Sequence, residues 1–254
     1  MVAVNETNQR WIRRFNPDPE AGVRLVCLPH AGGSASYFIP VARALSPGCD
    51  VLAVQYPGRQ DRRLEEPLKT VAELSDAVAE QLLIWADRPL VIFGHSMGAL
   101  VGFEVVHRLA ENGCRPAALI VSGRRAPNRV RAEAIHARTD EEILAEVGAL
   151  GGTDPIMFSD PEMRQVILTT LRADYTAVEN YLYIEREPLQ MPIAAHIGLD
   201  DPRVTIDEAR DWAQHTTGHF DIQTYSGGHF YLNEQASALI ANLRRTLRVA
   251  QNCS

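Results

Sequence analysis

The chain has 254 residues, which is long enough for one large domain with a single core and short for two. Its formal net charge of −7 argues against nucleic-acid binding, because clustered Lys and Arg side chains are what mainly hold phosphates. The sequence has no apolar signal-peptide region, no apolar stretch of membrane-spanning length, and no C-x-x-C pair among its four scattered cysteines. We therefore predict a cytoplasmic protein with no membrane segment and no bound metal.

Short apolar runs alternate with longer amphipathic patterns along the chain. The runs predicted to form strands occupy residues 23–28, 50–56, 89–94, 117–123, 193–198 and 220–225. The first five are almost continuous in apolar residues, as expected for parallel strands with both faces covered. Helical patterns lie at about 37–45, 71–86, 97–112, 207–214 and 233–248. This alternation predicts an α/β protein with a doubly wound, mostly parallel sheet.

One segment, between Arg124 and Pro192, interrupts this alternation because it contains no convincing buried strand. It has helical patterns instead, at 140–150 after an N-capping Thr139 and at 161–183. A helical insertion that follows a strand is a common way to build a lid over a site. We therefore expect a single domain of residues 1–254 with a helical lid inserted at about 124–192.

The most informative motif is Gly94-His95-Ser96-Met97-Gly98, which matches G-x-S-x-G. It follows a predicted strand and precedes a predicted helix, which is where α/β-hydrolases carry their nucleophilic serine on a sharp turn. Chance alone would place this triplet in a chain of such length on the order of 8% of the time, and the strand–turn–helix context lowers that figure several-fold. The motif predicts that Ser96 is the nucleophile of a serine hydrolase with the α/β-hydrolase fold.

A serine hydroxyl needs a base and an orienting acid, which follow it in the order Asp or Glu, then His in this fold. Among the eight histidines, His229 lies in a glycine-containing loop between the last predicted strand and the last helix. Asp200 and Asp201 both follow the preceding strand. Adjacent loop side chains point in different directions, so only one should reach His229, and the residues alone leave both open.

Two backbone N–H groups are needed to stabilise the oxyanion that develops during acyl transfer. One normally belongs to the residue after the nucleophile, here Met97. The other is expected in the loop Pro29–Ser34 after the first predicted strand, where Ala31 is the candidate and His30 is expected to brace the loop. A phosphate-binding role for the glycines in this loop is disfavoured, since neither standard phosphate motif is present.

Several segments together resemble a known family. They are LPHAGGSASYF (28–38), YPGRQDRRLEEP (56–67), FGHSMGAL (93–100), GLDDPRV (198–204) and GGHFYL (227–232). The chain resembles type II thioesterases, the free-standing editing enzymes of bacterial polyketide synthases and nonribosomal peptide synthetases. The G-x-S-x-G motif is shared by every lipase and esterase. Combining H-A-G-G-S with P-G-R-x-x-R and G-G-H-F is far more specific, and the similarity extends from about Val23 to the last helix.

The resemblance implies hydrolysis of an acyl thioester held on the phosphopantetheine arm of an acyl or peptidyl carrier protein, with no cofactor of the enzyme's own. It also implies that the helical insertion covers the acyl pocket. The spacing G-x-x-D-x-x-V is usual in hydrolases that resemble this chain, and it favours Asp201 over Asp200.

Arginines provide candidate substrate contacts. Arg59 and Arg62 are expected to border the pocket entrance, although ion-paired or solvated arginines are commoner than ligand-binding ones. A local patch for docking an acidic carrier protein is expected near the start of the lid, at Arg124, Arg125, Arg129 and Arg131. Two other functions remain open: a carboxylesterase or lipase acting on oxygen esters, and a hydrolase-fold binding protein without turnover.

Overall fold

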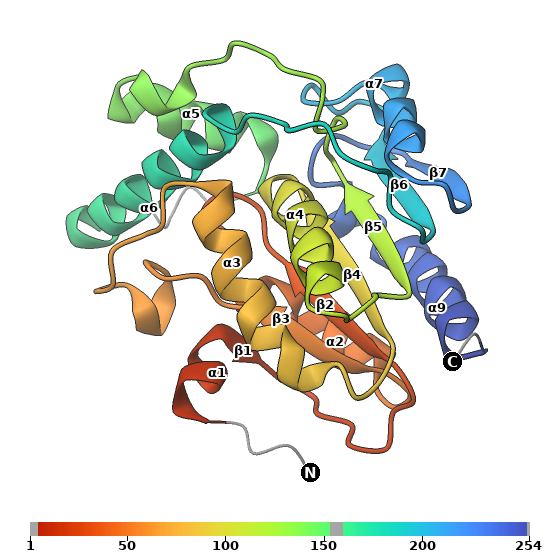
Figure 1. Ribbon diagram of the computed structural model, residues 1–254. Helices are drawn as coiled ribbons and strands as arrows, with labels where there is room; N and C mark the ends of the chain where they lie inside the picture. Colours follow the sequence, from red (N-terminus) through yellow and green to blue (C-terminus); the bar gives the residue numbers. More distant parts are fainter. Residues whose placement is uncertain (1–4, 153–159, 253–254) are drawn as a thin grey trace.

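The computed structural model describes residues 5–152 and 160–252, and a central sheet organises them (Figure 1). Its strands are β1 (Ile12–Arg13), β2 (Arg24–Leu28), β3 (Asp50–Val54), β4 (Leu90–His95), β5 (Ala118–Ser122), β6 (Ile193–Gly198) and β7 (Phe220–Tyr225). Within the described residues the sheet has seven strands in the order β1-β3-β2-β4-β5-β6-β7. All neighbours pair in parallel except β1, which is antiparallel to β3. The predicted α/β class with a mostly parallel sheet is confirmed.

All six predicted strands are present, with ends that differ from the prediction by at most two residues. The sequence did not indicate β1. This strand is only two residues long and pairs at the sheet edge, where Ile12 lies opposite Val54. A two-residue segment is too short to show the alternation from which strands are recognised.

Helices cover both faces of the sheet. They are α1 (Glu6–Trp11), α2 (Ile39–Leu45), α3 (Val71–Leu82), α4 (Met97–Glu111), α5 (Asp140–Leu150), α6 (Pro161–Glu179), α7 (Ile206–Arg210), α8 (Tyr231–Glu234) and α9 (Ala236–Asn252). Helices α3 and α4 pack on one face, and α2 and α9 pack on the other. None of the helices in the described ranges is long and apolar enough to cross a membrane.

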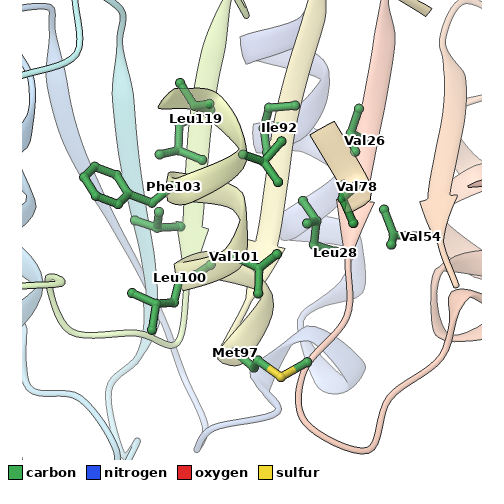
Figure 2. Close-up of a cluster of buried hydrophobic side chains, with 14 of the residues drawn as sticks. Val26, Leu28, Val54, Val78, Ile92, Met97, Leu100, Val101, Phe103 and Leu119 are labelled. Carbon is green, nitrogen blue, oxygen red and sulfur yellow. The ribbon is translucent and has the colours of Figure 1, made fainter. Parts of the chain in front are cut away.

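Alternate residues of each central strand enter the two cores. Val26 of β2 packs with Val78 of α3 and Val101 of α4, and Figure 2 shows part of this core. Leu25, the preceding residue of β2, belongs to the opposite core with Leu243 of α9. Because both faces are buried, every residue of the strand is apolar or paired, which explains the continuous apolar runs in the sequence.

The segment after β5 is helical, as predicted. Helix α5 has the predicted bounds and begins with a capping box, in which Thr139 accepts from the Glu142 N–H and the Glu142 side chain accepts from the Thr139 N–H. Helix α6 ends at Glu179, four residues earlier than predicted, with Asn180 as its C-cap. Residues 153–159 of the predicted insertion lie outside the described residues.

Helices α5 and α6 form a small core of their own above the carboxyl ends of the strands (Figure 1). It joins Ile143 and Val147 of α5 to Leu168 and Leu171 of α6. Helix α6 also contributes Ala177 to the core beneath α4. Helix α5 therefore rests on α6, and α6 rests on the body of the protein.

Candidate active site

The turn between β4 and α4 places Ser96 in a strained backbone conformation, with φ 55° and ψ −114°. The positions two residues before and after Ser96 have no room for a side chain. A Cβ on Gly94 would lie 2.0 Å from the Gly98 carbonyl oxygen, and a Cβ on Gly98 would lie 2.1 Å from the Leu28 carbonyl oxygen. The sharp turn therefore requires glycine at both positions, which is the physical basis of the G-x-S-x-G pattern.

The loop after β6 carries the two adjacent aspartates, and only one of them reaches His229. The Asp201 carboxylate is fully buried, and its Oδ2 lies 2.8 Å from Nδ1 of His229. Its Oδ1 accepts a hydrogen bond of 2.8 Å from the Arg203 N–H. Asp200 is exposed to solvent. The structure therefore brings together the predicted pair His229 and Asp201 and separates it from Asp200.

Glycines allow these two loops to approach one another. A Cβ on Gly198, the last residue of β6, would lie 2.2 Å from the Gly228 carbonyl oxygen. The Asp200 N–H also donates to the Gly227 carbonyl, at 3.0 Å. This close contact brings the aspartate-bearing loop and the histidine-bearing loop within hydrogen-bonding range.

A cavity of about 50 Å³ is lined by Ser96, His229, Met97 and Ala31, so all the predicted groups except the buried Asp201 surround one space. The Ser96 hydroxyl makes no hydrogen bond to another described residue in this state of the protein. Hydrogen bonds between a nucleophile and its base are often long in ligand-free enzymes and tighten when substrate binds.

Two residues that line this cavity have backbone N–H groups without acceptors. Within residues 5–152 and 160–252, neither the Ala31 nor the Met97 N–H is hydrogen-bonded, whereas the Gly32 and Gly33 N–H groups both have acceptors. Met97 is also the first residue of α4, so the positive end of the helix dipole adds to the field at this point. A hydroxyl, an oriented imidazole and two free N–H donors are the groups that acyl transfer requires.

Two further histidines, His30 and His95, lie near His229. Burial lowers the pKa of His30 to about 3 and the pKa of His95 well below its usual value, and the nearby His229 acts in the same direction. Nδ1 of His95 is 2.9 Å from the Ser122 hydroxyl, which in turn is 2.7 Å from the Tyr231 hydroxyl. His30 and His95 are therefore neutral at physiological pH, so positive charge that develops on His229 meets no second imidazolium.

His30 braces its loop, as its position in the sequence suggested. Its ring contacts Tyr37 at a centroid distance of 4.8 Å and Phe230 at 4.7 Å. A Cβ on Gly33 would lie 2.9 Å from the His30 ring. The role of His95 beside His229 was not predicted, because the motif leaves that position unspecified.

The four arginines predicted to form a docking patch all line one small cavity, and their role in docking stays a prediction. Arg125 is only 4% exposed and donates to the carbonyls of Arg129 and Arg203. Arg124 lines the cavity beside Ser96. Of the remaining two, Arg129 pairs with Asp211 and Arg131 with Glu208.

The arginines of the P-G-R-x-x-R segment are ion-paired. Arg62 binds Glu65 at 2.6 Å and stacks over Trp11. Arg59 pairs with Asp174 of α6, and both of these side chains are buried. Both arginines are therefore held in ion pairs, which favours a structural role for them over direct substrate contact.

A second, larger cavity of about 820 Å³ is lined by residues at the amino ends of the strands, such as Leu90, Ala118 and Ile193. The groups discussed above lie at the carboxyl ends of the strands. Ligand sites in open α/β sheets occur at the carboxyl ends. The smaller cavity is therefore the candidate active site.

Comparison with known proteins agrees with this geometry. The profile of the thioesterase domain family matches residues 23–247. Thioesterase PikA5 of Streptomyces venezuelae is 47% identical over 234 residues, which cover 91% of this chain and 83% of PikA5. The type II thioesterase BorB from the borrelidin biosynthetic cluster has a TM-score of 0.88 at 46% identity, covering 93% of this chain and 97% of BorB.

A further type II thioesterase, YbtT from the yersiniabactin NRPS/PKS pathway, has a TM-score of 0.85 at 31% identity and covers 94% of this chain and 99% of its own. The family profile spans most of the chain, and this chain covers 83% or more of each of these relatives. The chain therefore belongs to the thioesterase family and is a type II editing thioesterase of polyketide and nonribosomal peptide biosynthesis, with the α/β-hydrolase fold.

Proposed function

We propose that this thioesterase hydrolyses acyl groups from the phosphopantetheine arm of acyl or peptidyl carrier proteins, with Ser96 as nucleophile, His229 as base and Asp201 as orienting acid. The observation that carries the proposal is the buried 2.8 Å contact between Asp201 and His229, at a cavity that Ser96 also lines. Similar proteins support it, since BorB is a type II thioesterase from the borrelidin biosynthetic cluster and YbtT is one from the yersiniabactin NRPS/PKS pathway.

In the first half of the reaction, Nε2 of His229 takes the proton from the Ser96 hydroxyl as its oxygen attacks the thioester carbonyl. The N–H groups of Met97 and Ala31 stabilise the oxyanion, and Asp201 stabilises the imidazolium. His229 then gives the proton to the departing pantetheine sulfur. A thiol, with a pKa of about 8.5, leaves far more readily than an amine or an alcohol.

In the second half, His229 removes a proton from water, which attacks the acyl-enzyme carbonyl. The carboxylic acid is released and the Ser96 hydroxyl is restored. No cofactor takes part, since the phosphopantetheine belongs to the carrier substrate. This sequence returns a blocked carrier to its free thiol form, which is the outcome that an editing enzyme must produce.

We also propose that the insertion at about 124–192 acts as the lid of this single domain. Val147 and Leu150 of α5 line the cavity together with Tyr175 and Val178 of α6, so these helices contribute walls to the acyl pocket.

Cys27, Cys49 and Cys114 are free thiols, in keeping with action in the reducing cytoplasm.

The test is hydrolysis of a panel of acyl groups on a phosphopantetheinylated carrier protein, compared with matched oxygen esters, using Ser96→Ala as the control. We expect the wild type to release the acyl group from the carrier, and the variant to release it at a rate lower by several powers of ten. Cleavage of oxygen esters alone would indicate a carboxylesterase or lipase. Ligand binding without turnover would indicate a binding protein.

A further inference from the structure

Helix α6, part of the predicted lid, contacts the loop that bears Ala31. Oδ2 of Asp174 accepts a hydrogen bond of 2.7 Å from the Gly32 N–H. Leu171 fills the space where Gly32 lacks a side chain, since a Cβ there would lie 2.6 Å from Cδ2 of Leu171. Helix α6 and the loop that bears Ala31 are thus joined by a polar contact and by close apolar packing.

The carboxylate of Asp174 is itself held by Arg59. Both of its oxygens accept from Nη2 of Arg59, with both side chains buried. Arg59 is fixed in turn by the Pro57 carbonyl at 2.6 Å and lies over the Tyr56 ring. The Thr170 hydroxyl donates to the Gly58 carbonyl at 2.9 Å, so α6 is anchored to the Arg59 loop at a second point.

Burial raises the pKa of the Asp174 carboxyl overall, and Arg59 and the Gly32 N–H act against this effect. These two partners hold the carboxyl group in one position. Removing one partner would leave the other charge uncompensated, which is costly in a low-dielectric interior.

Gly32 has a φ of +75°, so its backbone is free to adopt other conformations that most residues avoid. The turn is also held by the hydrogen bond from the Gly33 N–H to the His30 carbonyl, at 2.9 Å. The Gly32 N–H belongs to the Ala31–Gly32 peptide unit, and the Ala31 N–H belongs to the preceding His30–Ala31 unit. Only the two backbone dihedral angles of Ala31 therefore separate the amide held by Asp174 from the candidate donor beside the Ser96 cavity, so fixing the first restricts the direction of the second.

We propose that Asp174, held by Arg59, is a positioning residue for the oxyanion hole: the lid helix α6 fixes the direction of the Ala31 N–H through Gly32. This inference rests on the proposed acyl-transfer function of the site. Helix α6 is a fixed part of the active site, so any movement that admits substrate must leave the Asp174–Gly32 contact in place.

The test compares Asp174→Asn with Glu65→Gln, a matched carboxylate-to-amide change in the Arg62–Glu65 pair, which does not touch the Gly32 loop. The active enzyme in each preparation is counted by fluorophosphonate titration. Affinity for an alkyl boronic acid, whose tetrahedral adduct uses the oxyanion hole, is then measured by calorimetry. Turnover of an acyl-carrier substrate is measured per active site.

We expect Asp174→Asn to lower kcat per active site and boronate affinity together, by about 10- to 100-fold, with KM changed much less. Glu65→Gln should match the wild type. A merely structural role would reduce the number of titrated sites and leave both per-site values unchanged, which would overturn the inference.

Should Asp174→Asn not fold, Arg59→Lys provides the second variant, because it retains the charge but loses the geometry of the guanidinium. We expect its boronate affinity to fall by several-fold, and an unchanged affinity would overturn the inference. The boronate measurement does not depend on the carrier substrate. Absence of wild-type thioester turnover would therefore count against the proposed function, while boronate affinity would still decide the role of Asp174.

Discussion

Replacing Ser96 by glycine is expected to stabilise the fold relative to Ser96→Ala, although both variants lose the proposed nucleophile. Ser96 has φ 55° and ψ −114°, a conformation that glycine adopts readily and that residues with a Cβ adopt only under strain. Such strain costs on the order of 1–3 kcal/mol. The alanine variant retains the Cβ and therefore retains the strain.

The expected magnitude follows from two opposing effects. Glycine relieves the strain but costs about 0.5–1 kcal/mol more backbone entropy than alanine on folding. Loss of the hydroxyl cancels in the comparison, because both variants lack it. The glycine variant should therefore be more stable by roughly 1 kcal/mol, a rise in Tm of about 2–4 °C for a domain of this size.

The assay is urea unfolding of the two variants side by side, followed by circular dichroism and intrinsic fluorescence, with equal m-values as the condition for comparison. At an unstrained position, glycine would be the less stable of the two by about 0.5–1 kcal/mol. That ordering at position 96 would refute the claim that the turn stores strain.

Three other perturbations test separate parts of the account. Asp201→Asn should lower kcat by about three to four powers of ten, because the imidazole loses its orienting acceptor, while Asp200→Asn stays near wild type; equal losses in both variants would refute the assignment of Asp201. Gly98→Ala should destabilise the fold by more than about 3 kcal/mol, since its Cβ would lie 2.1 Å from the Leu28 carbonyl. Gly148→Ala in α5, with open space around the new Cβ, should instead stabilise by about 0.5–1 kcal/mol in the same unfolding assay, and a similar response of the two variants would contradict the packing argument. Burial lowers the pKa of His196 to about 4, so the folded state binds fewer protons than the unfolded state between that value and the usual 6.5, and stability falls as pH falls across this window. His196→Gln should reduce the slope of unfolding free energy against pH there by up to about 1.4 kcal/mol per pH unit, and an unchanged slope would show that His196 is not the group responsible.

The strands and the nucleophile turn could be predicted because their causes are local. A strand buried on both faces must be apolar at nearly every position, and a turn as tight as that at Ser96 admits only glycine at positions 94 and 98. His229 was also recognisable, since its loop follows the last strand of the sheet.

Other features depend on contacts that no short segment encodes. Asp200 and Asp201 differ only in the direction of their side chains, which the contact between Gly198 and Gly228 determines. The Arg59–Asp174 pair joins residues 115 positions apart, so the motif that contains Arg59 suggested only an arginine near the entrance. The packing of the lid helices was likewise beyond prediction, because α5 and α6 are arranged by a separate small core.

The most direct test of the central claim is to trap the acyl-enzyme. The protein is mixed with an acyl-carrier substrate, quenched within milliseconds to seconds, and digested for mass spectrometry. We expect the mass of the acyl group on the peptide that contains Ser96, with its loss in Ser96→Ala and much slower formation when His229 is replaced, because His229 is the base in the acylation step. Release of the acyl group from the carrier by the wild type, with no acyl group ever detected on Ser96, would contradict the account.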